Sequence, residues 1–571
     1  MTSVQGCILV LAGLWAILML GFFYGQYKAL QAHLPLQKLE SAEQSFYLSR
    51  QQQPKPYDGQ AVYDPAPVVP PSIPVRSGED VMRFPAAIPS YEGPPQERLQ
   101  EQVEQDIANQ PLLHVEPEPD HQPVNDNNNG DASLITNHAD RSKDECVLEL
   151  LAADKINYQR DYTQKPIWIQ DPSWTRSMPG CAVGCNYASK PKQSYTDAIV
   201  TNNPASTSNK GYSVLRNMES VTNYPQIDVH KARARGYDIV MNTHLNSDVP
   251  VGYFSWVEYG IMEPPQHKTE KAAAAAFISN CGAKSPRLKV LEYFIQHGVP
   301  IDSFGKCAHN KEEGGKRDKM GLLRRYRFAL AFENSEEEDY VTEKYFQALV
   351  AGSVPIVVGA PNIHDYEPSP NSIIHVNSAT PDGLAKISNR IKYLMANATA
   401  YEEMLAWKRA GPGEKFRALV DMSSTHSACR LCLLVATKQR NKEEARASRK
   451  CRCQHEESSV HHIYIRERGQ LYFKDVFVTV DDSNPSGNSN LLPQLYQDIY
   501  KLYGPDYKPQ WFKERKPYSS HEGRPWKIYR VYPADSNQRQ ALYGNAWFRD
   551  SQQLVEYLST NQCPQLEVVF V

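Results

Sequence analysis

The residues best suited to chemistry flank the apolar segment 328–332 (FALAF), which is typical of a buried strand. Glu333 and Asn334 follow it directly, and Glu343 and Lys344 open the next amphipathic segment. A lysine in the first turn of a helix is unfavourable for the helix dipole, so Lys344 is expected to have an anionic partner. A phosphate or diphosphate would supply one. On spacing alone, a solvated Glu-Lys helix start is an equally good interpretation.

An acidic run, residues 336–339 (EEED), separates these two groups. Its composition favours a solvated loop over a metal site. The chain contains no Asp-x-Asp triplet, which proteins that hold a diphosphate through a metal often use. The sequence therefore predicts no metal ligands. Any diphosphate would be held by cationic side chains of the protein, although a divalent ion could stimulate a reaction at this site.

Short apolar strands alternate with amphipathic helices on either side of this region. Strands are predicted at 237–241, 325–332 and 354–358, and helices at 288–297 and 341–351, the last ending at Gly352. Strand, helix and strand joined by short connections indicate a parallel sheet with crossovers. Ligands of such sheets bind at the carboxyl ends of the strands, beside helix N-termini.

Residues 332–362 (FENSEEEDYVTEKYFQALVAGSVPIVVGAPN) resemble the signature of the alpha-1,3-fucosyltransferases, glycosyltransferase family ten. Two further segments, 217–220 and 279–287, resemble other parts of that family. The plant core alpha-1,3-fucosyltransferases are the most similar branch, through residues 236–241 and 248–256, HSACRLC at 426–432 and the tail at 563–571. The resemblance covers about residues 146–571.

The resemblance implies an α/β fold of GT-B type, with two Rossmann-like lobes, the active site between them and a small α+β C-terminal extension. An N-terminal transmembrane helix and a disordered stem would precede them. The expected parts are a cytoplasmic tail at 1–6, a signal-anchor at 7–24, a stem at 25–145, an acceptor-binding lobe at 146–275, a GDP-fucose-binding lobe at 276–453 and the extension at 454–571.

The same resemblance implies site residues by motif position. Glu219 would be the general base, although without the family match it would pass for an ordinary exposed residue. The donor-binding residues would be Arg287, Asn334, Tyr340, Glu343 and Lys344. Arg287 and Lys344 would face the phosphates of GDP-fucose, which is a donor substrate, so no cofactor is expected.

The implied reaction inverts the anomeric centre and places fucose on the 3-hydroxyl of the innermost GlcNAc of an N-glycan, so N-glycosylated proteins would be the acceptors. One alternative moves fucose to outer antennae, in alpha-1,3 or alpha-1,4 linkage, as in Lewis-type structures. The other alternative is a Golgi glycan-binding protein without catalysis on the same scaffold.

The N-terminal part of the chain indicates membrane attachment. Residues 7–24 are uncharged and apolar, long enough to span a bilayer as a helix, and poorly suited to cleavage as a signal peptide. The stem is rich in Pro, Gln and Asn and cannot bury enough apolar surface to fold. Together with the resemblance, this predicts a single-pass type II protein of the Golgi membrane with a lumenal head. The net charge of −3 gives no reason to expect a nucleic-acid partner.

Ten of the 11 cysteines lie outside the apolar run, and an even number in an oxidising compartment favours disulfides. The candidates that could instead form a zinc site are Cys429, Cys432, Cys451 and Cys453. Asn397, in Asn-Ala-Thr between two predicted helices, is a glycosylation acceptor if the head is lumenal. The C-terminal extension is expected to brace the catalytic lobes, with contact to the acceptor as the alternative.

Overall fold

The computed structural model describes residues 143–178, 180–190, 195–207, 211–254, 259–312, 318–510 and 526–571. The expected cytoplasmic tail, signal-anchor and nearly all of the stem lie outside these residues. Within them, no helix combines the length and apolar character needed to cross a bilayer. The helix α4 (Lys143–Ala153) begins two residues before the expected end of the stem at residue 145.

The first sheet has six short strands, all parallel to their neighbours except β2. Its order is β2-β3-β1-β4-β5-β6. The predicted strand at 237–241 is confirmed as β6. The strands are β1 (Ile167–Gln170), β2 (Arg176–Ser177), β3 (Cys185–Ala188), β4 (Ala198–Val200), β5 (Tyr212–Arg216) and β6 (Ile239–Met241). The short helix α5 (Val229–Ala234) begins where the Asp228 carboxylate accepts the Lys231 amide.

The second sheet has five strands, all parallel, in the order β11-β10-β9-β7-β8. Its strands are β7 (Ala274–Ala276), β8 (Ile301–Ser303), β9 (Phe328–Phe332), β10 (Val354–Val358) and β11 (Ile374–His375), and its main helices are α6 (Arg287–Gln296), α7 (Lys319–Arg324), α8 (Glu343–Ala351) and α9 (Pro381–Ala396). The parallel α/β architecture expected from the sequence is confirmed. The predicted strand 325–332 begins later, at Phe328, because α7 runs up to Arg324.

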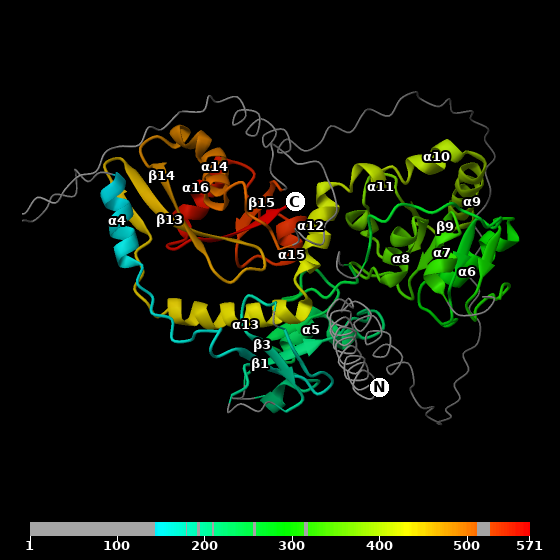
Figure 1. Cartoon of the computed structure of the whole chain (residues 1–571), viewed down its shortest axis with the longest axis horizontal. Coiled ribbons are helices and arrows are strands. Elements are labelled where there is room, and N and C mark those ends of the chain that lie inside the picture. The colour runs from blue at the N-terminus through cyan, green and yellow to red at the C-terminus, as the bar shows by residue number, and fades with distance from the viewer. Residues whose placement is uncertain are drawn as a thin grey trace, which may run out of the picture. The chain divides into compact units, whose positions relative to one another are not determined.

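Helices cover both faces of the second sheet (Figure 1). Phe294 of α6 and Leu384 of α9 pack with Leu330 of β9, whereas Ala348 of α8 packs with Ala329, which points to the opposite face. The helix α8 ends at Gly352 as expected, with φ +63°. A side chain there would also press on Pro265, since a Cβ would lie 2.8 Å from its Cα.

The third sheet belongs to the C-terminal extension and has the order β12-β13-β16-β15, with β14 paired to β13. Only β13 and β16 run parallel to each other. The strands are β12 (Arg452–His455), β13 (Ser458–Glu467), β14 (Lys474–Asp481), β15 (Ile528–Pro533) and β16 (Gln565–Phe570), and the helices are α14 (Leu491–Tyr503), α15 (Gln538–Leu542) and α16 (Ser551–Thr560).

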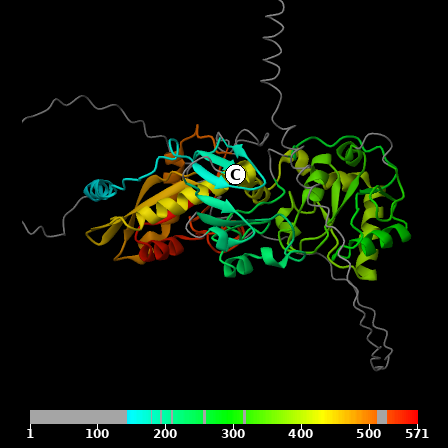
Figure 2. The ribbon, with the colours of Figure 1, turned by 90° about the horizontal axis from the view of Figure 1, so that it is seen from below.

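Two helices pack against a different part of the fold from the one to which the expected domain boundaries assign them. The helix α13 (Ser427–Glu444) packs through Leu431 and Val435 on the first sheet, not on the second (Figures 1 and 2). The helix α4 packs on β12 and β13 of the extension. Between the second sheet and α13 lie α10 (Ala398–Glu403), α11 (Trp407–Ala410) and α12 (Glu414–Asp421).

All ten described cysteines form disulfides. The pairs are Cys146–Cys453, Cys181–Cys429, Cys185–Cys432, Cys281–Cys307 and Cys451–Cys563. Two of these bonds fasten α13 to the first sheet, and two lie within the extension and α4. The zinc interpretation of the four candidate cysteines is wrong, since each of them is bonded to a different distant cysteine.

Candidate active site between the two parallel sheets

Glu219 follows the end of β5, where the first sheet approaches the loop after β9. Its main-chain amide donates to Asn217 Oδ1 at 2.7 Å, which shapes the turn. The side chain is half-buried. Tyr340, from the second sheet's side, directs its hydroxyl to Glu219 Oε2 at 3.4 Å. The structure therefore brings the expected base and one expected donor-binding residue together from segments 121 residues apart.

Glu333, the first residue after β9, organises the donor side of the site. It is only 2% exposed. Its Oε1 accepts the Thr342 amide at 2.9 Å and the Thr342 hydroxyl at 2.7 Å, and its Oε2 accepts Lys344 Nζ at 3.1 Å. Gly359 leaves room for it, because a Cβ there would lie 2.9 Å from Glu333 Cγ. Glu333 was not among the site residues that the family resemblance implied, although its place at the end of the predicted strand had marked it as suited to chemistry.

Lys344 has the anionic partners that its position in the helix predicted, and in this structure they are carboxylates. Besides Glu333, its Nζ contacts Glu343 Oε1 at 3.2 Å and the Thr342 hydroxyl at 2.8 Å. Burial alone would lower the pKa of Lys344, but Glu333 and Glu343 outweigh it, so the pKa is raised. Burial likewise opposes ionisation of Glu343, yet Lys344 and Lys319 lower the pKa of Glu343. Both side chains are therefore charged at neutral pH.

Arg287 is the first residue of α6, and its side chain contacts the end of β9. Its Nη1 donates to Phe332 O at 3.3 Å and its Nη2 to Asn280 O at 2.6 Å. Its Nε is buried and has no hydrogen-bond partner within the described part of the chain. Burial lowers the pKa of Arg287, although the neighbouring Glu333 opposes the shift. The guanidinium thus retains an unused donor beside the Glu333 cluster.

Asn334 and Tyr340 complete the expected donor set. The Asn334 main-chain oxygen accepts the amides of Lys284 and Ser285 at 3.0 and 3.1 Å, which ties the loop after β9 to the start of α6. Tyr340 is 3% exposed, and burial raises its pKa, with Glu333 and Glu219 acting in the same direction. Tyr340 is therefore a neutral hydrogen-bond donor at neutral pH.

The acidic run is not the solvated loop that its composition suggested, because the carboxylates of two of its members are held by protein contacts. Glu337 accepts the amides of Val221 and Thr222 at 2.9 and 2.7 Å, and it contacts His244 Nε2 at 2.7 Å. All three partners come from the first lobe. Burial opposes the ionisation of both groups, but their mutual contact raises the pKa of His244 and lowers that of Glu337. Glu337 therefore ties the two lobes together next to Glu219.

Asp339, the second of these acids, is buried and ties the same loop to the C-terminal extension. Its carboxylate accepts Arg539 Nη2 at 2.6 Å, the Leu245 amide at 2.9 Å and the Tyr366 hydroxyl at 3.1 Å. Asp339 also has φ +63°, a conformation that costs free energy and persists only where the surroundings enforce it. Tyr340 is the next residue, so these contacts fix its position.

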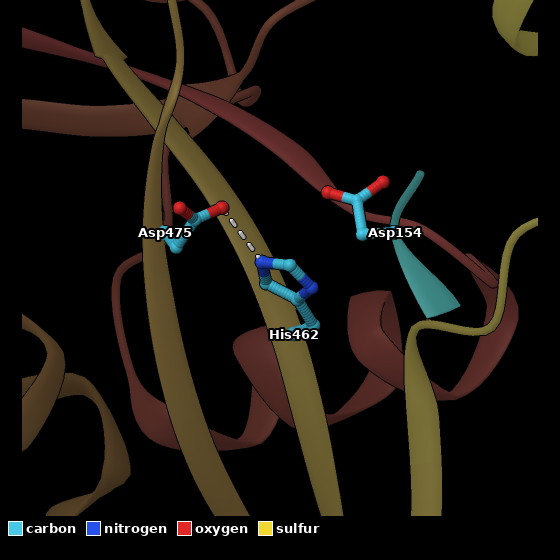
Figure 3. Close-up of side chains that lie close together, drawn as sticks. All are labelled: Asp154, His462 and Asp475. Carbon is cyan, nitrogen blue, oxygen red and sulfur yellow. Dashed lines mark hydrogen bonds and ion pairs between the residues drawn. The ribbon is translucent and has the colours of Figure 1, made fainter. Parts of the chain in front are cut away.

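The remaining predicted residues lie elsewhere. Asn397 is the N-cap of α10, accepting the Ala400 amide at 3.1 Å, and its glycosylation stays a prediction. Among the described residues, Asp154, His462 and Asp475 lie close enough to hold a metal ion (Figure 3). Protein partners already satisfy the three: His462 binds Asp475 at 2.8 Å and Tyr464 at 3.0 Å, and Asp154 pairs with Arg449. We assign no metal to them.

Residues 265–450 match the family model "Glycosyltransferase family 10 (fucosyltransferase) C-term". A "Putative fucosyltransferase-like protein" of Arabidopsis thaliana is 42% identical over 445 residues, which cover 77% of this chain and 83% of that protein. The "Glycoprotein 3-alpha-L-fucosyltransferase A" of Drosophila melanogaster is 34% identical over 32% of this chain and 34% of its own length. The "GDP-fucose protein O-fucosyltransferase 3" of Danio rerio is 35% identical over 25% of this chain and 32% of its own length.

Among solved structures, an "alpha1,3-Fucosyltransferase with GDP" aligns over 47% of this chain and 82% of its own, with 15% identity and a TM-score of 0.32. The Arabidopsis relative spans most of the sequence and the family model spans the segment that carries α6 to α13. On these two matches, the chain belongs to glycosyltransferase family 10, the fucosyltransferases.

Proposed function

We propose that this fucosyltransferase moves L-fucose from GDP-fucose to the 3-hydroxyl of the innermost GlcNAc of protein N-glycans. In this proposal the two parallel-sheet lobes form a GT-B fold, with the acceptor on the first lobe and the donor on the second. Family membership supports the donor and the reaction class. The acceptor is supported by the resemblance to the plant core branch and by the glycoprotein 3-fucosyltransferase among the relatives.

The observation that carries the proposal is the position of Glu219. Its carboxylate lies at the meeting of the two lobes, 3.4 Å from the hydroxyl of Tyr340, which in turn adjoins the Glu333 and Lys344 cluster. A base on one lobe thus faces a cluster of charged donor-binding candidates on the other. An inverting transfer needs this division, because the nucleophile and the leaving group occupy opposite sides of the sugar.

In the proposed step, Glu219 removes the proton of the acceptor 3-hydroxyl while that oxygen bonds to C1 of fucose. The bond between C1 and the β-phosphate oxygen breaks, and its electron pair leaves with GDP. The configuration changes from β in the donor to α in the product. Glu219 ends protonated and returns its proton to solvent.

Lys344 and Arg287 are the proposed partners of the departing diphosphate. Lys344 would exchange part of its contact with Glu333 and Glu343 for phosphate oxygens, and the free Nε of Arg287 offers a further donor. Cations placed where charge develops stabilise the transition state. Asn334, Tyr340 and Glu343 would hold the sugar or the nucleotide. With these groups no cofactor is needed, although a divalent ion could stimulate.

We further propose that the enzyme acts in the Golgi lumen, attached through residues 7–24. The disulfides among the described residues are consistent with an oxidising compartment. Localisation of a tagged full-length chain, with protease protection of the C-terminal tag in sealed Golgi vesicles, tests this orientation. Digestion of the tag in intact vesicles would contradict it.

The acceptor is tested with purified enzyme, GDP-fucose and an N-glycopeptide that ends in GlcNAc and lacks galactose. Fragmentation should locate the added mass on the innermost GlcNAc. Glu219→Gln should lower kcat by about 10²-fold or more and leave GDP affinity unchanged. Fucose on an antennal GlcNAc would overturn the acceptor and keep the enzyme class. Fucose on Ser or Thr would instead favour protein O-fucosylation, the activity named for the Danio rerio relative.

GDP binding without any transfer by the wild-type protein would favour the remaining alternative, a glycan-binding protein on this scaffold. The described site argues against that alternative. Glu219 contacts Tyr340 across the two lobes, and Lys344 contacts Glu333 and Thr342 on the donor side, an arrangement that glycan binding alone does not require.

A further inference from the structure

A cavity of about 390 Å³ lies where three parts of the chain meet, apart from all the residues assigned to fucosyl transfer. Its walls come from the loop after β6 (residues 246–250), from α12 and α13, and from the extension at 466–470, 534–538 and 567–570. This volume is within the range of pockets that bind small molecules.

Three arginines line this cavity, and because Arg466 pairs with Glu567, two remain to be considered. Arg430 belongs to α13, and Arg468 follows β13. Arg430 Nε donates to Thr425 O at 3.0 Å. Both terminal nitrogens of Arg468 are buried and have no hydrogen-bond partner among the residues that the structure describes. Neither arginine forms an ion pair with a described residue, so two like charges face the same space uncompensated.

The electrostatics agree with this geometry. Burial, followed by repulsion from Arg468, lowers the pKa of Arg430 to about 9. Burial also lowers the pKa of Arg468, and only Tyr532, Glu567 and Tyr543 oppose it. At neutral pH both guanidinium groups remain charged, and their desolvation and repulsion are relieved only if an anion enters.

Three acidic residues that line the cavity have protein partners other than Arg430 and Arg468. Glu567 accepts Arg466 Nε at 2.9 Å and the Tyr532 hydroxyl at 3.0 Å. Glu467 accepts the Tyr507 hydroxyl, and burial raises its pKa to about 7, so it is partly neutral. Asp248 pairs with Arg233. Asp421 and Asp535 also line the cavity, but they are not among the charges that shift the pKa of Arg430 or Arg468.

We propose that this cavity is a second binding site, for a phosphate group, with Arg430 and Arg468 as its donors. Guanidinium groups match the oxygens of phosphate, which accept several charge-assisted hydrogen bonds at once. The volume exceeds that of one phosphate ion, so the group can belong to free phosphate or to a small phosphorylated molecule. Because α13 is fastened to the first sheet and Arg468 belongs to the extension, the bound phosphate stabilises the contact between them.

The test uses the purified full-length protein with saturating GDP, so that phosphate cannot report on the donor site. Inorganic phosphate is titrated at constant ionic strength against chloride, and Tm and calorimetric heat are recorded. Phosphate should raise the Tm of the wild type. Arg468→Gln should weaken phosphate binding at least tenfold and, without phosphate, should be as stable as the wild type or more stable, since a buried unpaired charge is gone.

Arg430→Gln is the second variant and should show the same loss, which keeps the test decisive if Arg468→Gln does not fold. Arg409→Gln removes an arginine whose side chain is 70% exposed and should respond like the wild type. Tighter binding of glucose 6-phosphate than of phosphate would assign the site to a phosphorylated small molecule, and equal or weaker binding would assign it to free phosphate. No phosphate effect with GDP present, or an undiminished effect in both glutamine variants, would overturn the proposal.

Discussion

At the scale of single residues, the donor side of the site depends on a shared set of charges. Lys344 lies between Glu333 and Glu343, and Glu333 also accepts two hydrogen bonds from Thr342. When the site is empty, the Lys344 ammonium group offsets the charge of two carboxylates. It also lies where it can contact a diphosphate. Removing it therefore affects both the empty enzyme and the reaction.

Lys344→Met should lower kcat/KM for GDP-fucose about 10²- to 10³-fold, because a charge that stabilises the leaving group is lost. It should also lower the free energy of unfolding, since Glu333 and Glu343 lose their common cation. Initial rates and denaturant unfolding measure the two effects. Lys501→Met, which removes an exposed lysine of α14, is the matched control. An unchanged kcat/KM in the folded Lys344 variant would refute the assigned role.

At the scale of elements, the loop that carries Tyr340 is held by its two neighbours. Glu337 binds main-chain amides and His244 of the first lobe, and Asp339 binds Arg539 of α15. The extension therefore contacts the loop that positions an expected donor-binding residue. This supports bracing as its role over direct contact with the acceptor.

Arg539→Met should destabilise the protein by about 3 kcal/mol, because it leaves the buried Asp339 without its cation. Among the molecules that stay folded, kcat should fall more than KM for GDP-fucose changes, since Tyr340 loses its fixed position. Adding Asp339→Asn should recover part of the stability by removing the unpaired charge. Arg549→Met, at an exposed position near α15, is the control. Stability loss with unaltered kinetics would reduce Arg539 to a purely structural residue.

The contact between His244 and Glu337 should make stability depend on pH. The pKa of His244 is raised above 6.5, so its contribution is complete below pH 6.5 and is lost as the pH rises through the raised value. The pKa of Glu337 is lowered, so its contribution is present above 4.5 and is lost as the pH falls below that. The contact is therefore strongest between about pH 4.5 and 6.5.

Unfolding of His244→Gln, compared with the wild type at pH 6 and pH 8, tests this dependence. The variant should be less stable than the wild type mainly at pH 6, and the difference should shrink at pH 8. His309→Gln removes an exposed histidine whose contact with Glu312 is screened by solvent, so its stability difference between pH 6 and pH 8 should be much smaller. An equal loss at both pH values would show that the charge of His244 does not matter.

At the scale of the whole molecule, the extension shares a hydrophobic core with the catalytic part. Tyr532, Leu542 and Val569 of the extension pack in one cluster with Phe346 and Leu349 of α8. The last strand, β16, is also an inner strand of its sheet, because it lies between β13 and β15. We therefore expect the extension and the catalytic lobes to depend on each other for stability.

Deleting residues 565–571 should abolish soluble, active enzyme. It removes the buried side chains of Leu566, Val568 and Phe570 from the extension core, and losses of 2–5 kcal/mol at each of several such sites exceed the stability of a typical domain. Leu566→Ala alone should cost about 2–5 kcal/mol. Leu148→Ala, at a position 66% exposed, is the control. Full activity of the deleted protein would show that the extension is dispensable.

The sequence alone determined the local elements and the family. Apolar periodicity placed β6, β9, β10, α6 and α8 within a few residues of their ends, because these elements bury regular faces and end at clear signals such as Gly352. The motif at 332–362 and the family match gave the expected site residues. The helices and strands and the family motif each depend on short stretches of chain, so neighbouring residues are enough to predict them.

Only the tertiary structure decided which distant segments meet. Glu337 is held by amides of the first lobe and Asp339 by Arg539, which is 200 residues away along the chain, so the composition of the run alone suggested a solvated loop. The cysteine content favoured disulfides and left zinc as an alternative, and the partner of each cysteine depends on which distant segments lie together. The sequence likewise gives no sign that Arg430 and Arg468 line the same cavity. Coulomb and desolvation energies depend on distance and burial, which only the folded chain sets.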